Sequence, residues 1–379
     1  MKSNFANDST QNSSTFNTCK AGFNTTLVGA CFLLLTCVPA LIAQNGYLPG
    51  PLLVVSTVPS NGDVNPYGVA FVPPNFPSGV LNPGDILVSN FNNSMNLQGT
   101  GTTIVQVTQQ AATSVFFTAQ PSQQGLSTAL WVLQEGLVVV GNFPSTDGTC
   151  STAGPGNLLV INSSGNQVQT ITDPNYINGP WDMAMFDFGG GQIDAFVANG
   201  LSGTVTRLDL LLVGGMFTVQ SKNTIASGYG FQCDPVTFVD APTGLVYDPK
   251  KDILYVASTV DNAIFAVSNA AHRNDSGGTG DVIYQDQQHL HGPLAMAVAP
   301  NGHFLVSNND VINSDPNQPS EIVEFTLAGK FVTQHSMDPA QGGSFGLSVS
   351  PNHVSVATSR FAAVNDNQSN LLIWTLPNH

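Results

Sequence analysis

Basic side chains are scarce in this sequence. Lysine and arginine together number 9, against 24 aspartates and glutamates, and the formal net charge is −15. Phosphate backbones and anionic lipid headgroups repel a chain this acidic. We therefore expect no nucleic-acid partner, and no membrane attachment except through a hydrophobic leader.

Charged residues of either sign are also few, at 9% of the chain, whereas 42% of the residues are hydrophobic. Disordered segments are poor in apolar residues, so these proportions indicate a folded protein with a large core or a repeat array. The sequence contains no nucleophile elbow, phosphate-binding glycine loop, cysteine–histidine metal finger or kinase signature. Those four kinds of site are therefore excluded.

The N-terminal segment has the features of a secretory leader. An apolar run over residues 26–43 follows a polar start that carries Lys2 and Lys20, and small residues stand at Ala40 and Ala43. A weakly basic start, an apolar stretch and a small-residue cleavage site are typical of a signal peptide.

We expect residues 1–43 to be this signal peptide and residues 44–51 to be a linker, which predicts a secreted, periplasmic or extracellular protein. An uncleaved signal anchor is one alternative, because the apolar run approaches the roughly 20 residues that span a bilayer. A lipoprotein leader is another, because residues 28–31 weakly resemble a lipoprotein cleavage box.

Cysteine is rare as well. The chain has 5, and only Cys150 and Cys233 lie beyond the expected leader. Two cysteines in an exported chain indicate one disulfide. Two buried thiols are the alternative.

What the sequence does contain is a repeat. Six related apolar segments recur at intervals of 51 to 62 residues: PYGVAF at 66–71, LSTALW at 126–131, PWDMAM at 180–185, PTGLVY at 242–247, PLAMAV at 293–298 and SFGLSV at 344–349. A second apolar run follows each of them: 85–90, 137–142, 194–199, 253–258, 303–308 and 354–359. A third run follows in every repeat, and a more polar fourth run closes the first five.

These quartets predict an all-β fold, a six-bladed β-propeller of four-stranded antiparallel blades spanning residues 52–379. Inner strands of a blade are buried on both faces and are continuously apolar, whereas the outermost strand meets solvent and alternates. The sixth repeat lacks a fourth strand, and residues 52–58 form an unassigned apolar strand. We expect that strand to complete the last blade and close the ring, because an open array would need polar caps.

One repeat resembles a known family. The segment ILYVASTVDNAIFAV at 253–267 resembles the NHL repeat, and Pro242-Thr243-Gly244-Leu245 resembles its opening. The resemblance implies a propeller, a fold that serves as a peptide or RNA platform, a lyase or a hydrolase in that family. Fold alone does not choose among these functions.

The end of each second strand predicts a ring of polar groups on one face. In that position stand Asn90, Asn142, Asn199, Ser258, Asn308 and Ser359. Four amides could bind a polar ligand or supply oxygens to calcium or magnesium. The alternative is structural, because asparagine readily hydrogen-bonds the backbone of its own turn.

Further candidate ligand-binding residues lie on the same face, near the mouth of the central channel of the propeller. Trp181 and Asp182 open the third repeat. Asp182 could pair with Arg360, which would leave the second strand of blade 6, and such a pair could be structural or functional. His289 and His291 lie in the loop that leads into blade 5, where they could bind a metal or transfer protons. A surface loop without such a role is the alternative.

Four long loops that leave second strands are expected to form a continuous polar crest on this face. They are residues 90–101, 142–155, 308–320 and 360–369. Cys150 lies in the second of them, and Cys233 lies in a long loop on the same face, so a disulfide would hold the border of the crest.

The hypothesis that follows is a monomeric extracytoplasmic binding scaffold whose ligand is a protein, a peptide or a small polar molecule. The alternative is a metal-dependent lactonase- or lyase-like enzyme with Asp182, Asn199, Asn308 and His291 at the channel mouth. Gluconolactonase-type propellers hold calcium with a glutamate as well, and the sequence places Glu135, Glu321 and Glu324 away from that mouth. A structural envelope protein is a third possibility.

Overall fold

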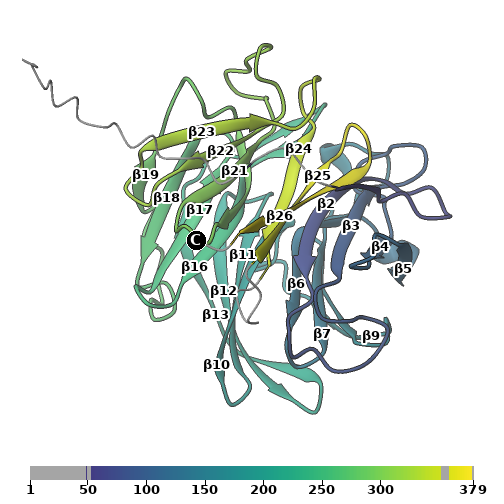
Figure 1. Ribbon diagram of the computed structural model, residues 1–379. Helices are drawn as coiled ribbons and strands as arrows, with labels where there is room; N and C mark the ends of the chain where they lie inside the picture. The colour runs from purple at the N-terminus through teal and green to yellow at the C-terminus, as the bar shows by residue number, and fades with distance from the viewer. Residues whose placement is uncertain (1–47, 49–52, 351–357, 378–379) are drawn as a thin grey trace, which may run out of the picture. The chain divides into compact units, whose positions relative to one another are not determined.

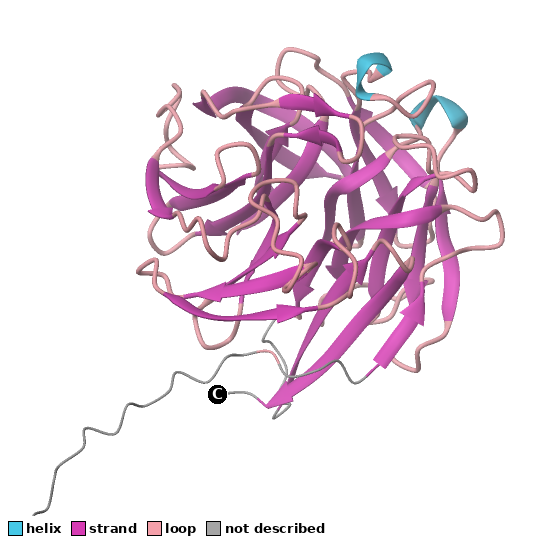
Figure 2. Cartoon of the chain, turned by 90° about the horizontal axis from the view of Figure 1, so that it is seen from above, coloured by secondary structure: helices cyan, strands magenta, loops and turns pink. Residues whose placement is uncertain are grey.

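The described residues of a computed structural model, 48, 53–350 and 358–377, form a six-bladed β-propeller. Six four-stranded antiparallel sheets, the blades, surround a common axis (Figures 1 and 2). An additional two-stranded hairpin lies between blades 3 and 4 in chain order. Helix in this part of the chain is confined to two 3-10 turns, η1 (Pro121–Gln123) and η2 (Cys150–Thr152). The all-β prediction and the number of blades are confirmed.

Blades 1 to 3 follow one another along the chain, and the strands of each run from the axis outward in sequence order. Blade 1 is β2 (Val64–Phe71), β3 (Ile86–Asn92), β4 (Thr103–Val107) and β5 (Thr113–Thr118). Blade 2 is β6 (Leu126–Leu133), β7 (Leu137–Asn142), β8 (Asn157–Asn162) and β9 (Gln167–Ile171). Blade 3 is β10 (Pro180–Gly189), β11 (Gln192–Asn199), β12 (Thr204–Val213) and β13 (Met216–Ser227).

The remaining blades have the same organisation, except that the last one uses both ends of the propeller chain. Blade 4 is β16 (Pro242–Asp248), β17 (Ile253–Ser258), β18 (Ala263–Ser268) and β19 (Asp281–Tyr284). Blade 5 is β20 (Pro293–Val298), β21 (Phe304–Asn308), β22 (Glu321–Phe325) and β23 (Phe331–Ser336). Blade 6 is β24 (Ser344–Val349), β25 (Thr358–Asn365), β26 (Asn370–Pro377) and β1 (Leu53–Ser56).

The predicted burial pattern explains why each segment becomes an inner or an outer strand of its blade. Every residue of β3, β7 and β21 is buried, because a second strand lies between two neighbouring blades. The outermost strands β9 and β1 have exposed residues beside more buried ones, as expected for strands with one face in solvent.

Closure of the ring by the N-terminal strand is confirmed. Leu53 pairs with Ile373 and Ser56 pairs with Asn370 in an antiparallel register. Thr57 continues the contact, since its backbone N–H donates to the Ser369 carbonyl at 3.0 Å. The edge of β26 that would otherwise be free is therefore covered.

The first strand of every blade is irregular at an equivalent point. The register with the second strand shifts near the start of the first strand in all six blades. Such bulges re-aim side chains and carbonyl groups. Hydroxyl groups of one blade accordingly bond to the bulged backbone of the next: Ser89 to the Ser127 carbonyl at 2.7 Å, Ser127 to Pro180 at 2.6 Å and Thr259 to Pro293 at 2.9 Å.

The second strand of blade 6 was predicted at 354–359, and this was wrong. The strand is β25, and Phe361 to Val364 are its buried apolar residues. Asn365 pairs with Ser344 as Asn308 pairs with Pro293. Asn365, not Ser359, is therefore the equivalent of the asparagines that end other second strands, called here the terminal asparagines. Residues 351–357 lie outside the described part of the chain.

The loop between blades 3 and 4 contains a hairpin that the sequence did not predict. It comprises β14 (Gln232–Asp234) and β15 (Phe238–Asp240). The predicted disulfide between Cys150 and Cys233 is present and ties this hairpin to the loop of blade 2 across a sequence separation of 83. The expected leader and linker lie outside the described residues, apart from Leu48, and within the described ones no helix has the length and apolar character that crossing a bilayer requires.

Candidate functional site

The loops that lead into the first strands and the loops that leave the second strands share one face, called here the upper face. They enclose a pocket of about 710 Å³, the upper pocket. Residues of blades 1, 5 and 6 and of the β14–β15 hairpin line it, including Asn92, Asn96, Asp234, Asp310 and Asp366. The predicted crest therefore surrounds a cavity, although the blade 2 loop contributes through the disulfide rather than as lining.

An aromatic cluster closes the central channel beneath this pocket. Tyr67 stacks on Phe345 with ring centroids 3.8 Å apart and on Phe91 at 4.6 Å. Trp181 packs its edge against Tyr67 at 5.5 Å and against Phe143 at 5.4 Å. We call these five residues, with Phe238, the aromatic plug.

Phe238 is the contribution of the hairpin to the plug. Its φ of 71° is unusual for a bulky residue, and the ring lies 5.2 Å from both Phe91 and Phe143. A strained backbone persists only where the surrounding structure holds it. The hairpin is therefore fixed over the upper face at two points, by the disulfide at Cys233 and by the buried ring of Phe238.

Buried polar atoms without a partner gather around the upper pocket. Of the described residues whose buried polar atoms lack a hydrogen bond, five line it: Asn92, Gln98, Asn309, Asp310 and Asp366. Buried polar groups in native proteins are nearly always satisfied, so each such atom requires an explanation. Water or a polar solute bound against the pocket wall could supply the missing partners.

Burial raises the pKa of two groups that line the pocket, Asp366 and Tyr67. Burial, with a smaller effect of Asp338, raises the pKa of Asp366 to about 7. Burial and the Asp366 charge also raise the pKa of Tyr67 well above its ordinary value. Near neutral pH the Asp366 carboxyl can thus either donate or accept a hydrogen bond.

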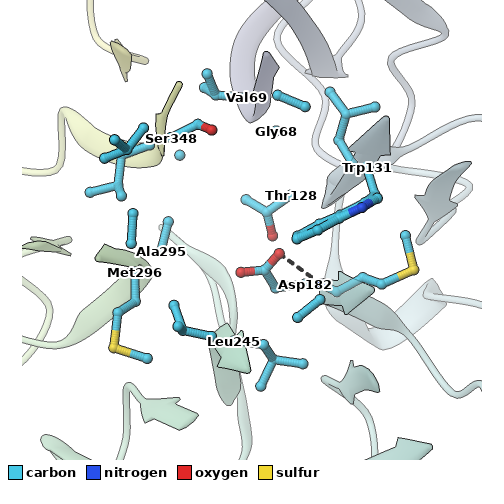
Figure 3. Close-up of a pocket in the computed structure, with 18 of the residues that line it drawn as sticks. Gly68, Val69, Thr128, Trp131, Asp182, Leu245, Ala295, Met296 and Ser348 are labelled. Carbon is cyan, nitrogen blue, oxygen red and sulfur yellow. Dashed lines mark hydrogen bonds between the residues drawn. The ribbon is translucent and has the colours of Figure 1, made fainter. Parts of the chain in front are cut away.

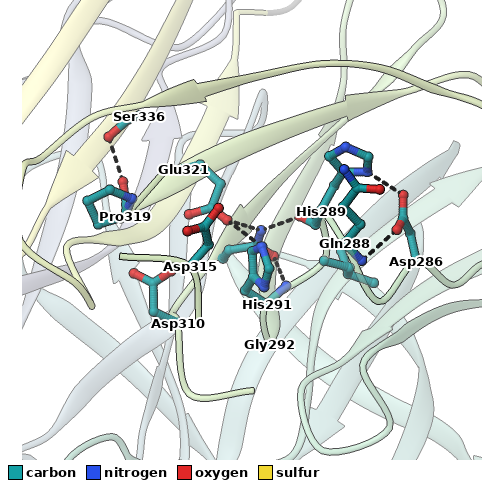
Figure 4. Close-up of polar contacts among 12 residues, drawn as sticks. Asp286, Gln288, His289, His291, Gly292, Asp310, Asp315, Pro319, Glu321 and Ser336 are labelled. Atoms are coloured by element: carbon teal, nitrogen blue, oxygen red, sulfur yellow. Dashed lines mark hydrogen bonds and ion pairs between the residues drawn. The ribbon is translucent and has the colours of Figure 1, made fainter. Parts of the chain in front are cut away.

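A buried cluster of Asp310, Glu321 and His291 adjoins the pocket in blade 5 (Figure 4). Nε2 of His291 lies 3.3 Å from a carboxylate oxygen of Glu321. Asp310 accepts the backbone N–H groups of Ser320 at 2.8 Å and Gly342 at 2.9 Å, which joins two loops of the pocket wall. Burial, followed by the Asp310 charge, raises the pKa of Glu321 to about 8.

The placement of Glu321 away from the mouth was wrong. Third strands begin on the face where second strands end, and Glu321 is the first residue of β22. That topological signal was available in the sequence, because the third run of blade 5 begins at this residue. His289, by contrast, points to Asp286 at 2.6 Å and stacks on Phe331.

The terminal asparagines lie buried and bond to neighbouring backbone and side chains. Asn308 accepts the His291 N–H at 3.0 Å and donates to the His289 carbonyl at 2.8 Å. Asn199 accepts the Asn178 N–H at 2.9 Å, and Asn142 accepts that of Asn157 at 2.9 Å. Asn90 donates to the Thr57 carbonyl at 3.1 Å.

These contacts agree with the structural role that the sequence leaves open for the ring of terminal asparagines. Each amide joins the end of a second strand to a neighbouring loop or strand. None of the four lines the upper pocket. Their direct contact with a ligand stays a prediction.

The pair of Asp182 and Arg360 does not form. Arg360 lies within β25, donates to the Gly84 carbonyl at 2.8 Å and covers the Phe71 ring, because blade 6 has a different register from the one predicted. Asp182 faces a separate cavity below the plug (Figure 3). Trp181 lies in the plug and is fully buried.

The four residues expected to hold a metal do not all converge. His291 contacts Asn308, whose amide also donates to a carboxylate oxygen of Glu321 at 3.0 Å. Asp182, however, faces the cavity below the plug, and Asn199 bonds to the Asn178 backbone and the Thr204 hydroxyl. In the described ranges no group of three or more His, Cys, Asp and Glu side chains is placed to bind one ion. The four expected ligands are therefore not brought to one point, and binding of calcium or magnesium stays a prediction.

No protein-family model matches this chain, and no curated protein matches its sequence. Solved structures match its fold. A protein described as a candidate gluconolactonase is 12% identical, with 86% of this chain and 93% of that one covered and a TM-score of 0.53. A candidate oxidoreductase (glucose dehydrogenase) from Thermus thermophilus is 14% identical, with 85% and 99% covered and a TM-score of 0.50. At these identities the likeness shows the propeller fold alone, and membership of the NHL family stays a prediction.

Proposed function

We propose that this protein binds a neutral or cationic, hydroxyl-rich small molecule, such as a short oligosaccharide, in the upper pocket. The observation that carries the proposal is the concentration of unpartnered polar atoms around one cavity. Asn92 and Gln98 offer amide oxygens, Asn309 offers an amide nitrogen, and Asp366 offers a carboxyl oxygen. Hydroxyl groups both donate and accept, so one polyol can satisfy acceptors and donors together.

The charge of the pocket favours this class of ligand over anions. Asp234, Asp310 and Asp366 line it, and no Lys, Arg or His is among its lining residues. The whole chain carries a net charge of −15, which adds to the repulsion of anions. A phosphorylated or carboxylated ligand would leave its charge without a partner here.

The floor of the pocket supports a sugar in particular. Tyr67 and Phe345 belong both to the pocket lining and to the plug. An aromatic surface packs against the apolar face of a pyranose, while the amides and carboxyls at the rim bond to its hydroxyl groups. The cavity volume of about 710 Å³ is within the range of small-molecule sites.

Binding in a secreted setting agrees with the disulfide, since disulfides persist in oxidising compartments. A concave cavity of this size favours a small polar ligand over a protein or peptide. The metal-dependent lactonase or lyase alternative gains no ligand set from the residues expected to supply one.

Calorimetric titration with three β-1,4-linked disaccharides, of glucose, glucosamine and glucuronic acid, tests the proposal. We expect the glucosamine disaccharide to bind at least as tightly as the glucose one, and the glucuronic acid disaccharide to bind at least tenfold more weakly. Asn92→Ala should weaken the first two, whereas Asn317→Ala, in an exposed loop position, should not. Preferred binding of the glucuronic acid disaccharide, or no binding by any of the three, would overturn the proposal.

A further inference from the structure

A second cavity lies on the other side of the aromatic plug (Figure 3). It has a volume of about 280 Å³, and the first strands of all six blades line it. Aliphatic, aromatic and thioether side chains form most of its wall, including Val69, Leu130, Met183, Leu245 and Met296. The space is equivalent to roughly nine waters of liquid volume, so it suits a compact organic ligand.

One carboxyl group stands in this apolar wall. Asp182 occupies the position at which four other blades have a residue without a polar side chain, namely Gly68, Gly244, Ala295 and Gly346, and at which blade 2 has Thr128. The blade architecture therefore does not require a carboxyl group there. It is the only Asp or Glu among the described residues that line the cavity.

No cation compensates this carboxyl group within the cavity. Asp182 accepts the backbone N–H of Met183 at 2.7 Å, and no Lys, Arg or His is among the lining residues. Burial raises the pKa of Asp182 to about 8, because the ionised form loses its hydration. A cationic ligand would restore the ionised form by supplying the missing opposite charge.

The walls beside Asp182 suit an organic cation. Figure 3 shows the Trp131 indole and the Asp182 carboxyl reaching into the same space. Aromatic faces attract cations most strongly when water is excluded, and methionine side chains adapt to irregular ligand shapes. Met183, Met185 and Met296 all line this cavity.

We infer that the lower cavity is a binding site for a compact alkylammonium group, with Asp182 as the counter-ion and Trp131 as the aromatic wall. The plug separates this site from the upper pocket, and Tyr67 is the only described residue that lines both. The lower site is therefore independent of the function proposed above, and either can fail without the other.

Choline and its uncharged isostere 3,3-dimethylbutan-1-ol test this inference, because they share a shape and differ in charge. Calorimetry on the wild-type protein should show choline binding at least tenfold more tightly than the isostere. Choline affinity should also rise at least tenfold between pH 6 and pH 9, as Asp182 ionises. Tyr67 and Tyr247 are the other titratable lining groups, and burial raises the pKa of both above this range.

Asp182→Asn should weaken choline at least tenfold, remove its pH dependence and leave disaccharide affinity unchanged. The matched control is Asp187→Asn, a carboxylate near the outer end of the same strand, which should change neither. Equal binding of choline and its isostere, full choline affinity in Asp182→Asn, or no choline binding by the wild type would overturn the inference. The isostere comparison decides the matter even if Asp182→Asn does not fold.

Discussion

Tyr67 of blade 1 lies flat against Phe345 of blade 6, with ring centroids 3.8 Å apart and planes 10° from parallel. The two residues hold equivalent positions, because each directly follows the residue at which the register of its first strand shifts. A bulge at that position turns these side chains toward the axis, so the channel is closed by aromatic rings. Among the described residues, Tyr67 alone lines both the upper pocket and the cavity below the plug, so the rings separate these two spaces.

Replacement of Tyr67 tests this plug. Tyr67→Leu should lower the free energy of unfolding by about 2–4 kcal/mol, because a buried aromatic ring and its stacking contacts are lost. It should also weaken disaccharide binding, because the floor of the upper pocket is removed. Tyr67→Phe is the control, since it keeps the stack, and denaturant unfolding with calorimetry reads out both effects. Equal losses in both variants would show that the hydroxyl, not the ring, matters.

Closure of the ring makes a separate prediction. A chain that lacks residues 1–58 should be less stable than one that lacks residues 1–43, by about 2–4 kcal/mol. Four backbone pairs between β1 and β26 are lost, and each hydrogen bond contributes about 1 kcal/mol net. Denaturant unfolding of the two chains measures the difference. Equal stability would mean that β1 does not hold blade 6 in the ring.

The disulfide should stabilise both the fold and the pocket. Cys150→Ser combined with Cys233→Ser should lower the free energy of unfolding by about 2–5 kcal/mol, because a loop of this length gains much freedom in the unfolded chain. Disaccharide affinity should fall too, since the hairpin carrying Asp234 is then held mainly by Phe238. Reduction of the wild-type protein should reproduce both changes. A stable reduced protein with unaltered affinity would contradict this role.

The buried carboxyl of Glu321 predicts how stability depends on pH. Its folded-state pKa of about 8 lies above the ordinary 4.5, so folding favours the protonated form. The corresponding stability is complete below about pH 4.5 and is lost as the pH rises through about 8. Asp182, Asp194 and Asp366 shift in the same direction, so the wild-type protein should lose stability between pH 5 and pH 8.5.

Glu321→Gln should lose less stability over this range, because its amide stays neutral and can donate to Asp310. Asp281→Asn changes an exposed carboxylate and should follow the wild-type curve. Urea unfolding at several pH values supplies the comparison. Parallel curves for Glu321→Gln and the wild type would refute the assignment.

The sequence was sufficient to predict the propeller because each strand rank has its own burial pattern. The buried runs at 137–142 and 303–308 and the complementary strand at 52–58 determined the number of blades and the closure. The disulfide was predictable because only two cysteines remain beyond the expected leader. The number of blades, the closure and the disulfide all follow from local burial patterns or from counting strands and cysteines.

The site was less predictable, because it depends on exact register and on loops. One misplaced strand, 354–359 instead of β25, put Arg360 at the wrong end of blade 6 and hid Asn365. Phe238 enters the plug from a hairpin of three-residue strands, too short to give a periodic pattern. Asp182 was recognised as unusual, but only the bulge geometry assigns it to the lower cavity.

A crystal structure with the glucosamine disaccharide bound tests the central claim most directly. The account predicts ligand density in the upper pocket, within hydrogen-bond distance of the unpartnered oxygens of Asn92 and Asp366, with one sugar ring above Tyr67 and Phe345. Density confined to the outer edges of the blades, with the upper pocket holding solvent alone, would contradict it.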